Sequence, residues 1–283
     1  MSSTDVLLEV AQVSKAFGVT QALDQASLSV GRGEVHALIG ENGAGKSTLM
    51  KILSGAYRPD SGTISLDGNS VTLSNPLVAR ELGIAMIYQE LNLAPDLTVA
   101  ENILLGTEPT RFGWVNGATQ KALAEGALAQ LENASIQPES LVKTLTIAQQ
   151  QLVEIARALA ADPKVVIMDE PTSSLTQADT QRLFDIIRSL KERGVSVIYI
   201  SHFLEECQSI CDRFTVLRDG LTVGSGDMET TSLDHIVHLM VGRDVEDIYN
   251  IPEHTIGEPV LTLNGVSGHR KPTGVSLELR RGE

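Results

Sequence analysis

A glycine-rich stretch, Gly40-Glu41-Asn42-Gly43-Ala44-Gly45-Lys46-Ser47-Thr48, has the spacing G-x-x-x-x-G-K-[ST] of a phosphate-binding loop. Glycines let the backbone curl so that successive N–H groups point at phosphate oxygens, and a helix starting here aims its positive dipole end at the same anion. Lys46 is expected to reach the β- and γ-phosphates, and Ser47 to offer its hydroxyl to Mg²⁺. The stretch therefore predicts a nucleoside triphosphate site.

Two carboxylates end a second apolar run, Val165–Met168. A buried strand here would bring Asp169 beside the phosphate loop, where it can hold Mg²⁺ directly or through water. Glu170 is expected to point the other way and to polarise the attacking water. A strand that ends in Asp-Glu is by itself also typical of a surface cap. Next to a phosphate loop it indicates phosphoryl transfer.

Strands must position these groups, and β-branched runs alternate with helical stretches along the chain. This alternation predicts an α/β fold with a mostly parallel sheet wrapped by helices. From about Asn92 to Asp162 the pattern is mainly helical and indicates an inserted helical subdomain. The other expected elements are strands over 35–39, 62–68, 83–88 and 195–200, helices over 48–53, 118–131, 180–192 and 233–240, and a hairpin over 213–223.

The composition indicates a folded globule: the chain has 283 residues, 42% of them hydrophobic, and a net charge of −14. This charge disfavours coating of nucleic acid or adhesion to anionic lipid by bulk charge, although a local basic patch stays open. No apolar run approaches the roughly 18–20 residues of a membrane span, and Met1–Val10 lacks the pattern of a secretory signal. Cys207 and Cys211 are expected to be reduced core residues of a cytosolic protein.

The end of the chain resembles its beginning. Residues 243–258 are polar and acidic and predict a linker. Beyond them, Leu261, Leu263 and Val266 repeat the spacing of Leu8, Val10 and Val13, and the segment ending at Glu283 resembles the segment ending at Glu34. We expect 1–242 to be one domain and 259–283 to be the truncated start of a second copy. The alternative is that two amphipathic strands look alike by chance.

In their order, these residues resemble the ATP-binding cassette (ABC) ATPases. Gln89 fits the family's glutamine loop and contacts Mg²⁺ there, and His202 fits the switch histidine at the γ-phosphate. Leu145-Thr146-Ile147-Ala148-Gln149 fits the signature loop, Pro171–Thr176 fits the D-loop, and Phe17 fits the ring that stacks on adenine. Taken singly, each of these residues also has an ordinary structural role. The resemblance implies a phosphate-loop NTPase (RecA-like) core with an antiparallel β subdomain and a helical subdomain over about 92–162.

Within that family the chain looks most like the ATPases of bacterial monosaccharide importers of the ribose, galactose, xylose and arabinose type. Four runs carry this resemblance: 88–93, 149–156, 201–206 and 239–243. It implies ATP and Mg²⁺ as ligands, two cassettes in one chain, and membrane permease subunits as partners. A periplasmic sugar-binding protein would act indirectly, no nucleic acid would bind, and the protein would lie peripherally on the cytoplasmic face of the inner membrane.

Two departures from the family pattern affect the expected activity. The signature loop usually reads L-S-G-G-Q, and here Ile147 and Ala148 replace both glycines. A Cβ where φ must be positive, or where a phosphate approaches closely, would cost on the order of 1 kcal/mol. Thr176 also replaces the D-loop aspartate. We therefore expect the competent site to join this phosphate loop to the signature loop of a second cassette, and the chain alone to hydrolyse ATP slowly.

Other functions stay open from the sequence. A soluble ABC ATPase of translation or DNA maintenance usually has basic surfaces or coiled-coil insertions, and neither is apparent here. A phosphate-loop kinase or GTPase would leave Gln89, His202 and the signature-like stretch without a purpose. A regulatory cassette that binds ATP without hydrolysis is disfavoured by the intact Glu170.

Overall fold

The computed structural model describes residues 6–111, 113–131, 136–242 and 256–282. The chain divides into two compact units, Met1–Val241 and Gly242–Glu283. Apart from its last three residues, the linker predicted over 243–258 lies outside the described residues.

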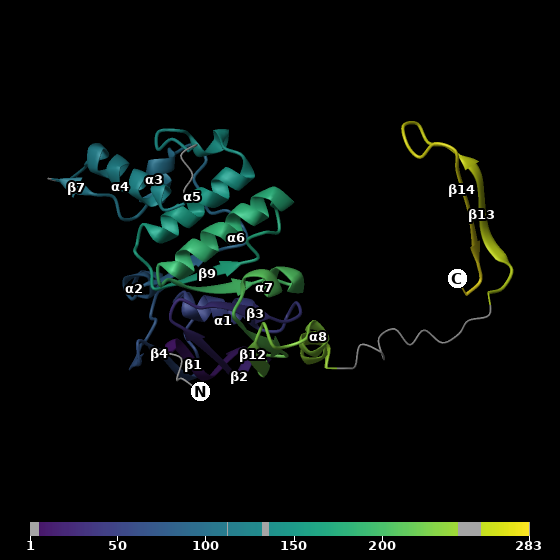
Figure 1. Cartoon of the computed structure of the whole chain (residues 1–283), viewed down its shortest axis with the longest axis horizontal. Helices are drawn as coiled ribbons and strands as arrows, with labels where there is room; N and C mark the ends of the chain where they lie inside the picture. The colour runs from purple at the N-terminus through teal and green to yellow at the C-terminus, as the bar shows by residue number, and fades with distance from the viewer. Residues whose placement is uncertain (1–5, 112, 132–135, 243–255, 283) are drawn as a thin grey trace. The chain divides into compact units, whose positions relative to one another are not determined.

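A six-stranded sheet forms the centre of the first unit (Figure 1). Five of its strands are parallel, and β12 pairs antiparallel with β11 at one edge. Because the parallel strands point the same way, the loops that follow β3, β6, β9 and β10 meet at one edge of the sheet. The strand order is β12 (Leu221–Asp227), β11 (Arg213–Arg218), β3 (Val35–Ile39), β10 (Ser196–Ile200), β9 (Val165–Asp169) and β6 (Ile84–Ile87).

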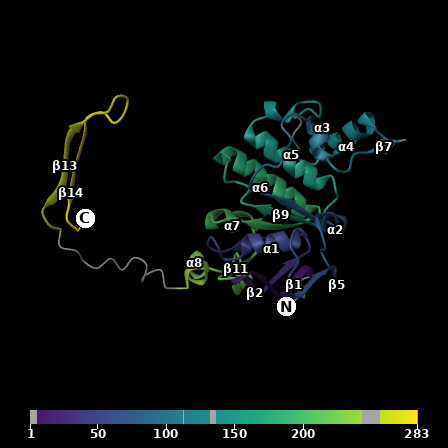
Figure 2. The ribbon, with the colours of Figure 1, turned by 180° about the vertical axis from the view of Figure 1, so that it is seen from behind.

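Both faces of this sheet are covered, so β3 and β10 are buried along their whole length. Alternate residues of β3 enter two different cores, as the period of two in a strand requires. Ala37 packs with the helices α6 (Gln177–Glu192) and α7 (Leu204–Ile210), whereas Leu38 packs with α1 (Lys46–Leu53). Figure 2 shows α1 from behind, between the six-stranded sheet and the antiparallel strands. The cysteines of α7 and its end are buried, free thiols, as predicted.

The second sheet of this unit is antiparallel, in the order β2-β1-β4-β5. It forms the antiparallel β subdomain that the resemblance implied. Its apolar residues, among them Val10 and Leu28, share a core with α1. The strands are β1 (Val6–Phe17), β2 (Thr20–Gly31), β4 (Ser61–Leu66) and β5 (Asn69–Ser70).

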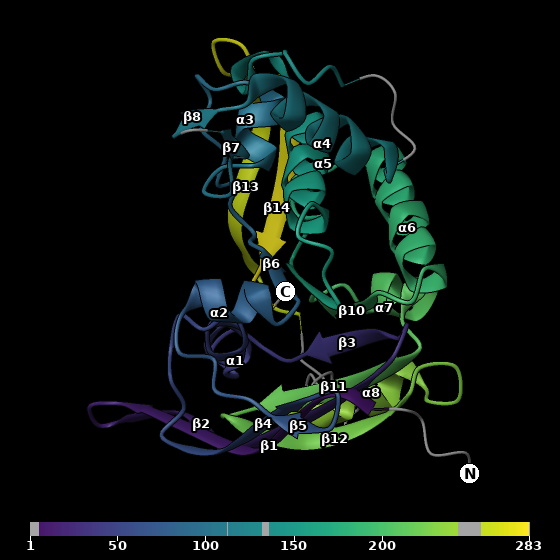
Figure 3. The same cartoon turned by 90° about the vertical axis from the view of Figure 1, so that its left-hand side faces the viewer.

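A group of helices is inserted between β6 and β9 and lies together at one end of the unit (Figure 3). The expected fold class is thus confirmed. The insertion also holds a short hairpin that the sequence did not predict, and α2 (Pro76–Glu81) was likewise not predicted. Within the described ranges, every helix is too short or too polar to cross a bilayer. The inserted elements are α3 (Val99–Ile103), β7 (Thr110–Arg111), β8 (Trp114–Val115), α4 (Gly117–Ala129), the 3₁₀ turn Val142–Thr144 and α5 (Ile147–Leu159), and the unit ends with α8 (Leu233–Val241).

The described part of the second unit is a hairpin of β13 (Pro259–Val266) and β14 (Val275–Arg280). Its register repeats that of β1 and β2. Residues at corresponding positions of the two similar segments are paired across the strands in both hairpins. Both hairpins shift register between their second and third such pairs. The pairs are Leu8↔Val30, Val10↔Leu28 and Val13↔Ala26 in the first hairpin, and Leu261↔Leu279, Leu263↔Leu277 and Val266↔Val275 in the second.

Candidate active site

The phosphate loop joins β3 to α1, and α1 begins at Lys46. Its N-cap residue Gly45 has a left-handed backbone with φ 103°, and no side chain caps the helix. The loop is fixed by backbone hydrogen bonds instead: Ala44 donates to the Glu41 carbonyl over 3.1 Å, and Gly220 donates to the Ala44 carbonyl over 3.1 Å. N–H groups at the start of α1 therefore face outward without side-chain partners, which favours an anion at this end.

Two glycines of the loop lie too close to neighbouring backbone to carry a side chain. A Cβ at Gly40 would lie 2.3 Å from the Leu217 carbonyl oxygen, and a Cβ at Gly45 would lie 2.7 Å from the Ala22 carbonyl oxygen. Gly43 has a positive φ of 88° too, but a Cβ there would meet nothing within 4 Å.

Gly45→Ala is expected to lower the free energy of unfolding by about 2–5 kcal/mol, because a left-handed backbone and an overpacked contact add their costs. Gly43→Ala carries the backbone cost alone, about 1–2 kcal/mol. Urea denaturation of both variants measures the difference. Equal losses in the two variants would contradict the close approach of β2 to Gly45.

Lys46 is buried, with 8% of its surface exposed. Its ammonium donates to the carbonyl oxygens of Gly40 over 2.6 Å and Glu41 over 3.0 Å, inside the curl of the loop. Burial lowers the pKa of Lys46, and the carboxylates of Glu170, Asp169 and Glu41 oppose this shift. Lys46 thus has carbonyl partners within the loop and a favourable charge interaction with Asp169, at the end of β9, and with Glu170 after it.

Asp169 is the last residue of β9, and its pKa is raised, first by burial and then by the neighbouring Glu170. Glu170 has a left-handed backbone with φ 45°, which ends the strand. Its N–H donates to the Ile200 carbonyl over 2.9 Å and so ties the end of β9 to the end of β10. Asp169 and Glu170 therefore both lie at the edge of the sheet where the loops meet.

Gln89 and His202 both reach the Glu170 carboxylate. The Gln89 side-chain amide donates to Glu170 Oε2 over 3.3 Å, and His202 Nδ1 lies 3.2 Å from Glu170 Oε1. These side chains come from the loops after β6, β9 and β10. The structure thus brings together three residues that the sequence had singled out separately.

Phe17 lies near the turn between β1 and β2, with 44% of its surface exposed. Its ring meets the edge of Tyr57, with centroids 5.2 Å apart, and the Lys15 ammonium lies 5.6 Å from its centroid. The sequence analysis did not identify Tyr57 as a neighbour of Phe17, although Tyr57 is an aromatic residue that follows shortly after α1. An exposed ring held by a neighbour on one side is able to stack on a flat ligand.

The signature loop is the N-terminus of α5. Thr146 is the N-cap, and it forms a capping box in which the Thr146 hydroxyl accepts from the Gln149 N–H and the Gln149 side chain accepts from the Thr146 N–H. Ile147 and Ala148 are ordinary helical residues of α5, so the expectation that their Cβ atoms strain a left-handed backbone was wrong. The Cβ atoms of Ile147 and Ala148 would therefore be unfavourable only where a phosphate has to approach the loop closely. Thr176 likewise caps α6, where it accepts from the Asp179 N–H.

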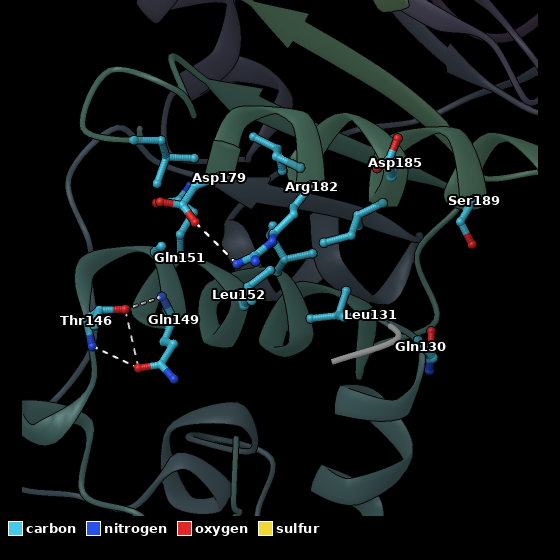
Figure 4. Close-up of a pocket in the computed structure, with 15 residues that line it drawn as sticks. Gln130, Leu131, Thr146, Gln149, Gln151, Leu152, Asp179, Arg182, Asp185 and Ser189 are labelled. Atoms are coloured by element: carbon cyan, nitrogen blue, oxygen red, sulfur yellow. Dashed lines mark hydrogen bonds and ion pairs between the residues drawn. The ribbon is translucent and has the colours of Figure 1, made fainter. Parts of the chain in front are cut away.

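Hydrogen bonds and ion pairs of the described residues do not join the signature loop to the phosphate loop. The signature loop borders instead a cavity of about 610 Å³ between α5 and α6 (Figure 4). Thr146 and Gln149 line one side of it, and the ion pair of Asp179 with Arg182, at 3.6 Å, lines the other. This cavity is therefore separate from the cluster around Glu170.

A parallel sheet with a phosphate loop after one strand, and an acidic pair after a strand near it, defines the class of phosphate-loop NTPases. A family model described as ABC transporter matches residues 23–173, more than half of the chain. The chain belongs to the ABC transporter family.

Relatives and solved structures agree with this assignment. The ribose import ATP-binding protein RbsA of Chromobacterium violaceum is 45% identical over 96% of this chain and 54% of its own length. A ribose import ATP-binding protein, RbsA 1, of Burkholderia ambifaria is 47% identical over 99% of this chain and 56% of its own length. The chain thus spans about half the length of these curated relatives.

Among solved structures, an ATP-binding cassette of an ABC transporter in its ADP conformation superposes with a TM-score of 0.74 at 27% identity, over 84% of this chain and 99% of that chain. A nucleotide-free ATP-binding cassette from an ABC transporter gives a TM-score of 0.72 at 26% identity, over 86% of this chain and 98% of that chain.

Proposed function

We propose that the chain binds and hydrolyses ATP and that this reaction powers import of a monosaccharide through a membrane permease. The observation that carries the hydrolytic part is the cluster of Gln89, Glu170 and His202 beside Lys46. It combines a buried cation for phosphate, a carboxylate for water, and polar side chains from the loops after β6 and β10, the two strands that flank β9.

The transported class follows from the relatives, whose names are ribose import ATP-binding proteins; one from Geobacillus kaustophilus is named as a possible ribose, galactose or methyl galactoside import protein. A soluble role in translation or DNA maintenance is not favoured by these names. The choice of sugar would belong to other chains, the permease and a periplasmic binding protein.

Mg²⁺ fits the donors at this site. Ser47 offers a hydroxyl, Asp169 a carboxylate and Gln89 an amide oxygen, and hard oxygen ligands of this kind suit Mg²⁺, which keeps several waters and phosphate oxygens besides. When bound, Mg²⁺ neutralises charge on the β- and γ-phosphate oxygens.

Different residues of this chain bind the phosphates, orient the attacking water and hold the base in ATP hydrolysis. The N–H groups from Gly40 to Thr48 hold the phosphates, and the Lys46 ammonium leaves the Gly40 and Glu41 carbonyls to meet phosphate oxygens. Glu170 orients water in line with the γ-phosphate, and Gln89 and His202 keep its carboxylate in place. Such positioning and charge stabilisation is most of what phosphoryl transfer needs. The exposed ring of Phe17 stacks on adenine.

A second cassette completes the site. The signature loop of the opposite cassette presents N–H groups and a hydroxyl to the γ-phosphate, and in this chain Leu145–Gln149 would do so with the side chains of Ile147 and Ala148 in the way. The repeated hairpin register at 259–280 supports a second cassette after the linker at 243–258. Two unequal composite sites are the consequence. The helical subdomain, about 92–162, would pass closure of the cassettes to the permease on the cytoplasmic face of the membrane.

Calorimetry tests the nucleotide part directly. Titration of ATP into the chain should show saturable binding with Mg²⁺ present and much weaker binding with EDTA, and Phe17→Ala should weaken this binding if the ring stacks on adenine. Turnover by the chain alone should be slow and should rise with protein concentration. The absence of Mg²⁺-dependent ATP binding to folded protein would overturn the proposal.

The affinity for MgATP is expected to fall at acid and at alkaline pH. Both losses should begin closer to neutral pH than they would if Asp169 and Lys46 had the pKa values of free side chains. The Asp169 pKa is raised, so protonation removes the metal ligand at a higher pH than for an ordinary aspartate. The Lys46 pKa is lowered, so the cation is lost at a lower pH than for an ordinary lysine. Calorimetry across pH measures both limbs. Because ATP itself titrates, Asp169→Asn is the control: its acid limb should lack the protein's contribution, and an unchanged acid limb would contradict this role.

A further inference from the structure

A third carboxylate, that of Glu206 on α7, gathers hydrogen bonds from three hydroxyl groups. Its Oε2 accepts from Tyr199 over 2.7 Å, from Thr172 over 2.9 Å and from Ser201 over 3.2 Å. All three donors are buried: Tyr199 is 0% exposed, Ser201 1% and Thr172 7%. Glu206 itself is half-buried. One oxygen atom thus holds polar groups that have little access to water.

These donors stand next to the hydrolytic residues in the sequence. Thr172 follows Glu170 by two positions, and Ser201 directly precedes His202. Ser201 also accepts a hydrogen bond from the Phe203 N–H over 3.0 Å, so its hydroxyl is linked to the backbone on the far side of His202. The loop after β9 and the loop after β10 are therefore both fastened to Glu206.

The contact between these loops at the site itself is weaker. His202 Nδ1 lies 3.2 Å from Glu170 Oε1, and the His202 ring is about half exposed. A single long hydrogen bond near solvent contributes only about 0.5–1.5 kcal/mol. The buried attachment to Glu206, together with the bond from the Glu170 N–H to the Ile200 carbonyl, is the stronger restraint on the separation of the two side chains.

We infer that Glu206 is a positioning residue of the hydrolytic site: by holding Thr172 and Ser201 it sets the distance between Glu170 and His202. It acts through these neighbours and is not itself one of the reacting groups. The inference deepens the proposed function and rests on it. Because a displacement of about 1 Å can cost on the order of 100-fold in rate, the network affects turnover more than nucleotide binding.

The removal of the carboxylate gives the test. In Glu206→Ala, kcat for ATP is expected to fall about 10- to 100-fold while the Kd for MgATP stays within about threefold. Glu206→Gln keeps one acceptor oxygen and should lose less, about 3- to 10-fold. Glu205→Ala changes an exposed carboxylate on the same helix and should leave both quantities unchanged. The rates of all variants are measured under one condition, the chain alone or together with a second cassette, whichever gives the unmodified protein its higher turnover.

A double-mutant cycle with His202→Ala separates positioning from simple destabilisation. If Glu206 acts through His202 and Glu170, Glu206→Ala should cost much less in the His202→Ala background than in the unmodified protein. Equal losses in the two backgrounds, or unchanged kcat in Glu206→Ala, would overturn the inference. If Glu206→Ala does not fold, the same double-mutant cycle is measured with Glu206→Gln in its place, and the same two outcomes apply. A failure of the unmodified protein to bind MgATP would instead overturn the proposed function.

Discussion

Lys46→Ala is expected to weaken the binding of MgATP about 10- to 150-fold, the range of a lost hydrogen bond to a charged group. The ammonium is buried within the loop, bonded to two backbone carbonyls and close to the carboxylates after β9. It needs only to exchange carbonyl oxygens for phosphate oxygens, so little reorganisation offsets the gain. Without it, the triphosphate would face Asp169 and Glu170 with no side-chain cation of the loop between them.

Calorimetry with MgATP measures this loss, and Lys51→Ala is the matched control. Lys51 is also on α1, but its side chain is exposed, with its ammonium 5.5 Å from the Tyr57 ring centroid. Both variants change the net charge equally, so a loss confined to Lys46→Ala reports position and not overall charge. In a two-cassette assembly, Lys46→Ala should also abolish most turnover. Near-normal turnover there would refute the assignment of the competent site to this phosphate loop.

Much of the site could be predicted because parallel strands bring their carboxyl ends to one edge. Gly40, Gln89, Asp169 and His202 each come within two residues of the end of a strand, so recognising four strands was enough to bring them together. Chain order and strand polarity determine this, and both can be read from the sequence. The same reasoning holds for the C-terminal hairpin, whose register follows from the spacing of its apolar residues.

Contacts between elements that are distant in sequence could not be predicted in the same way. The network of Glu206 depends on how α7 folds back onto β10 and onto the loop after Glu170, and no spacing in the sequence reports that. The error at Ile147 and Ala148 has another cause. The glycines of the usual signature pattern L-S-G-G-Q do not show that φ is positive at their positions. In this chain α5 begins there, with helical backbone that any residue adopts. For α2 a signal was present: Asn75 caps the helix and Pro76 occupies its first turn.

Glu170→Gln is expected to lower ATP hydrolysis about 10²- to 10⁴-fold, the usual contribution of a positioned acid or base. The amide cannot take a proton from water. It has nearly the same shape but only one acceptor oxygen, so it keeps one of the two contacts with Gln89 and His202 and removes the acceptor of the other. MgATP binding should persist or become tighter. Because Glu170 contributes to the raised pKa of Asp169, its neutralisation is expected to lower that pKa and to remove one negative charge from the site that receives the triphosphate.

Single-turnover hydrolysis and equilibrium binding, measured on the same protein, separate the two effects. Glu205→Gln is the matched control, because it also removes one carboxylate but lies at an exposed position of α7 outside the site. A general loss of negative charge would slow both variants alike, whereas loss of the group that orients water slows only Glu170→Gln. Hydrolysis by Glu170→Gln above about a tenth of the normal rate would mean that water is activated elsewhere, since a positioned base contributes far more than that. The Glu170–His202 contact would then be structural, and Glu206 would have no reacting pair to position.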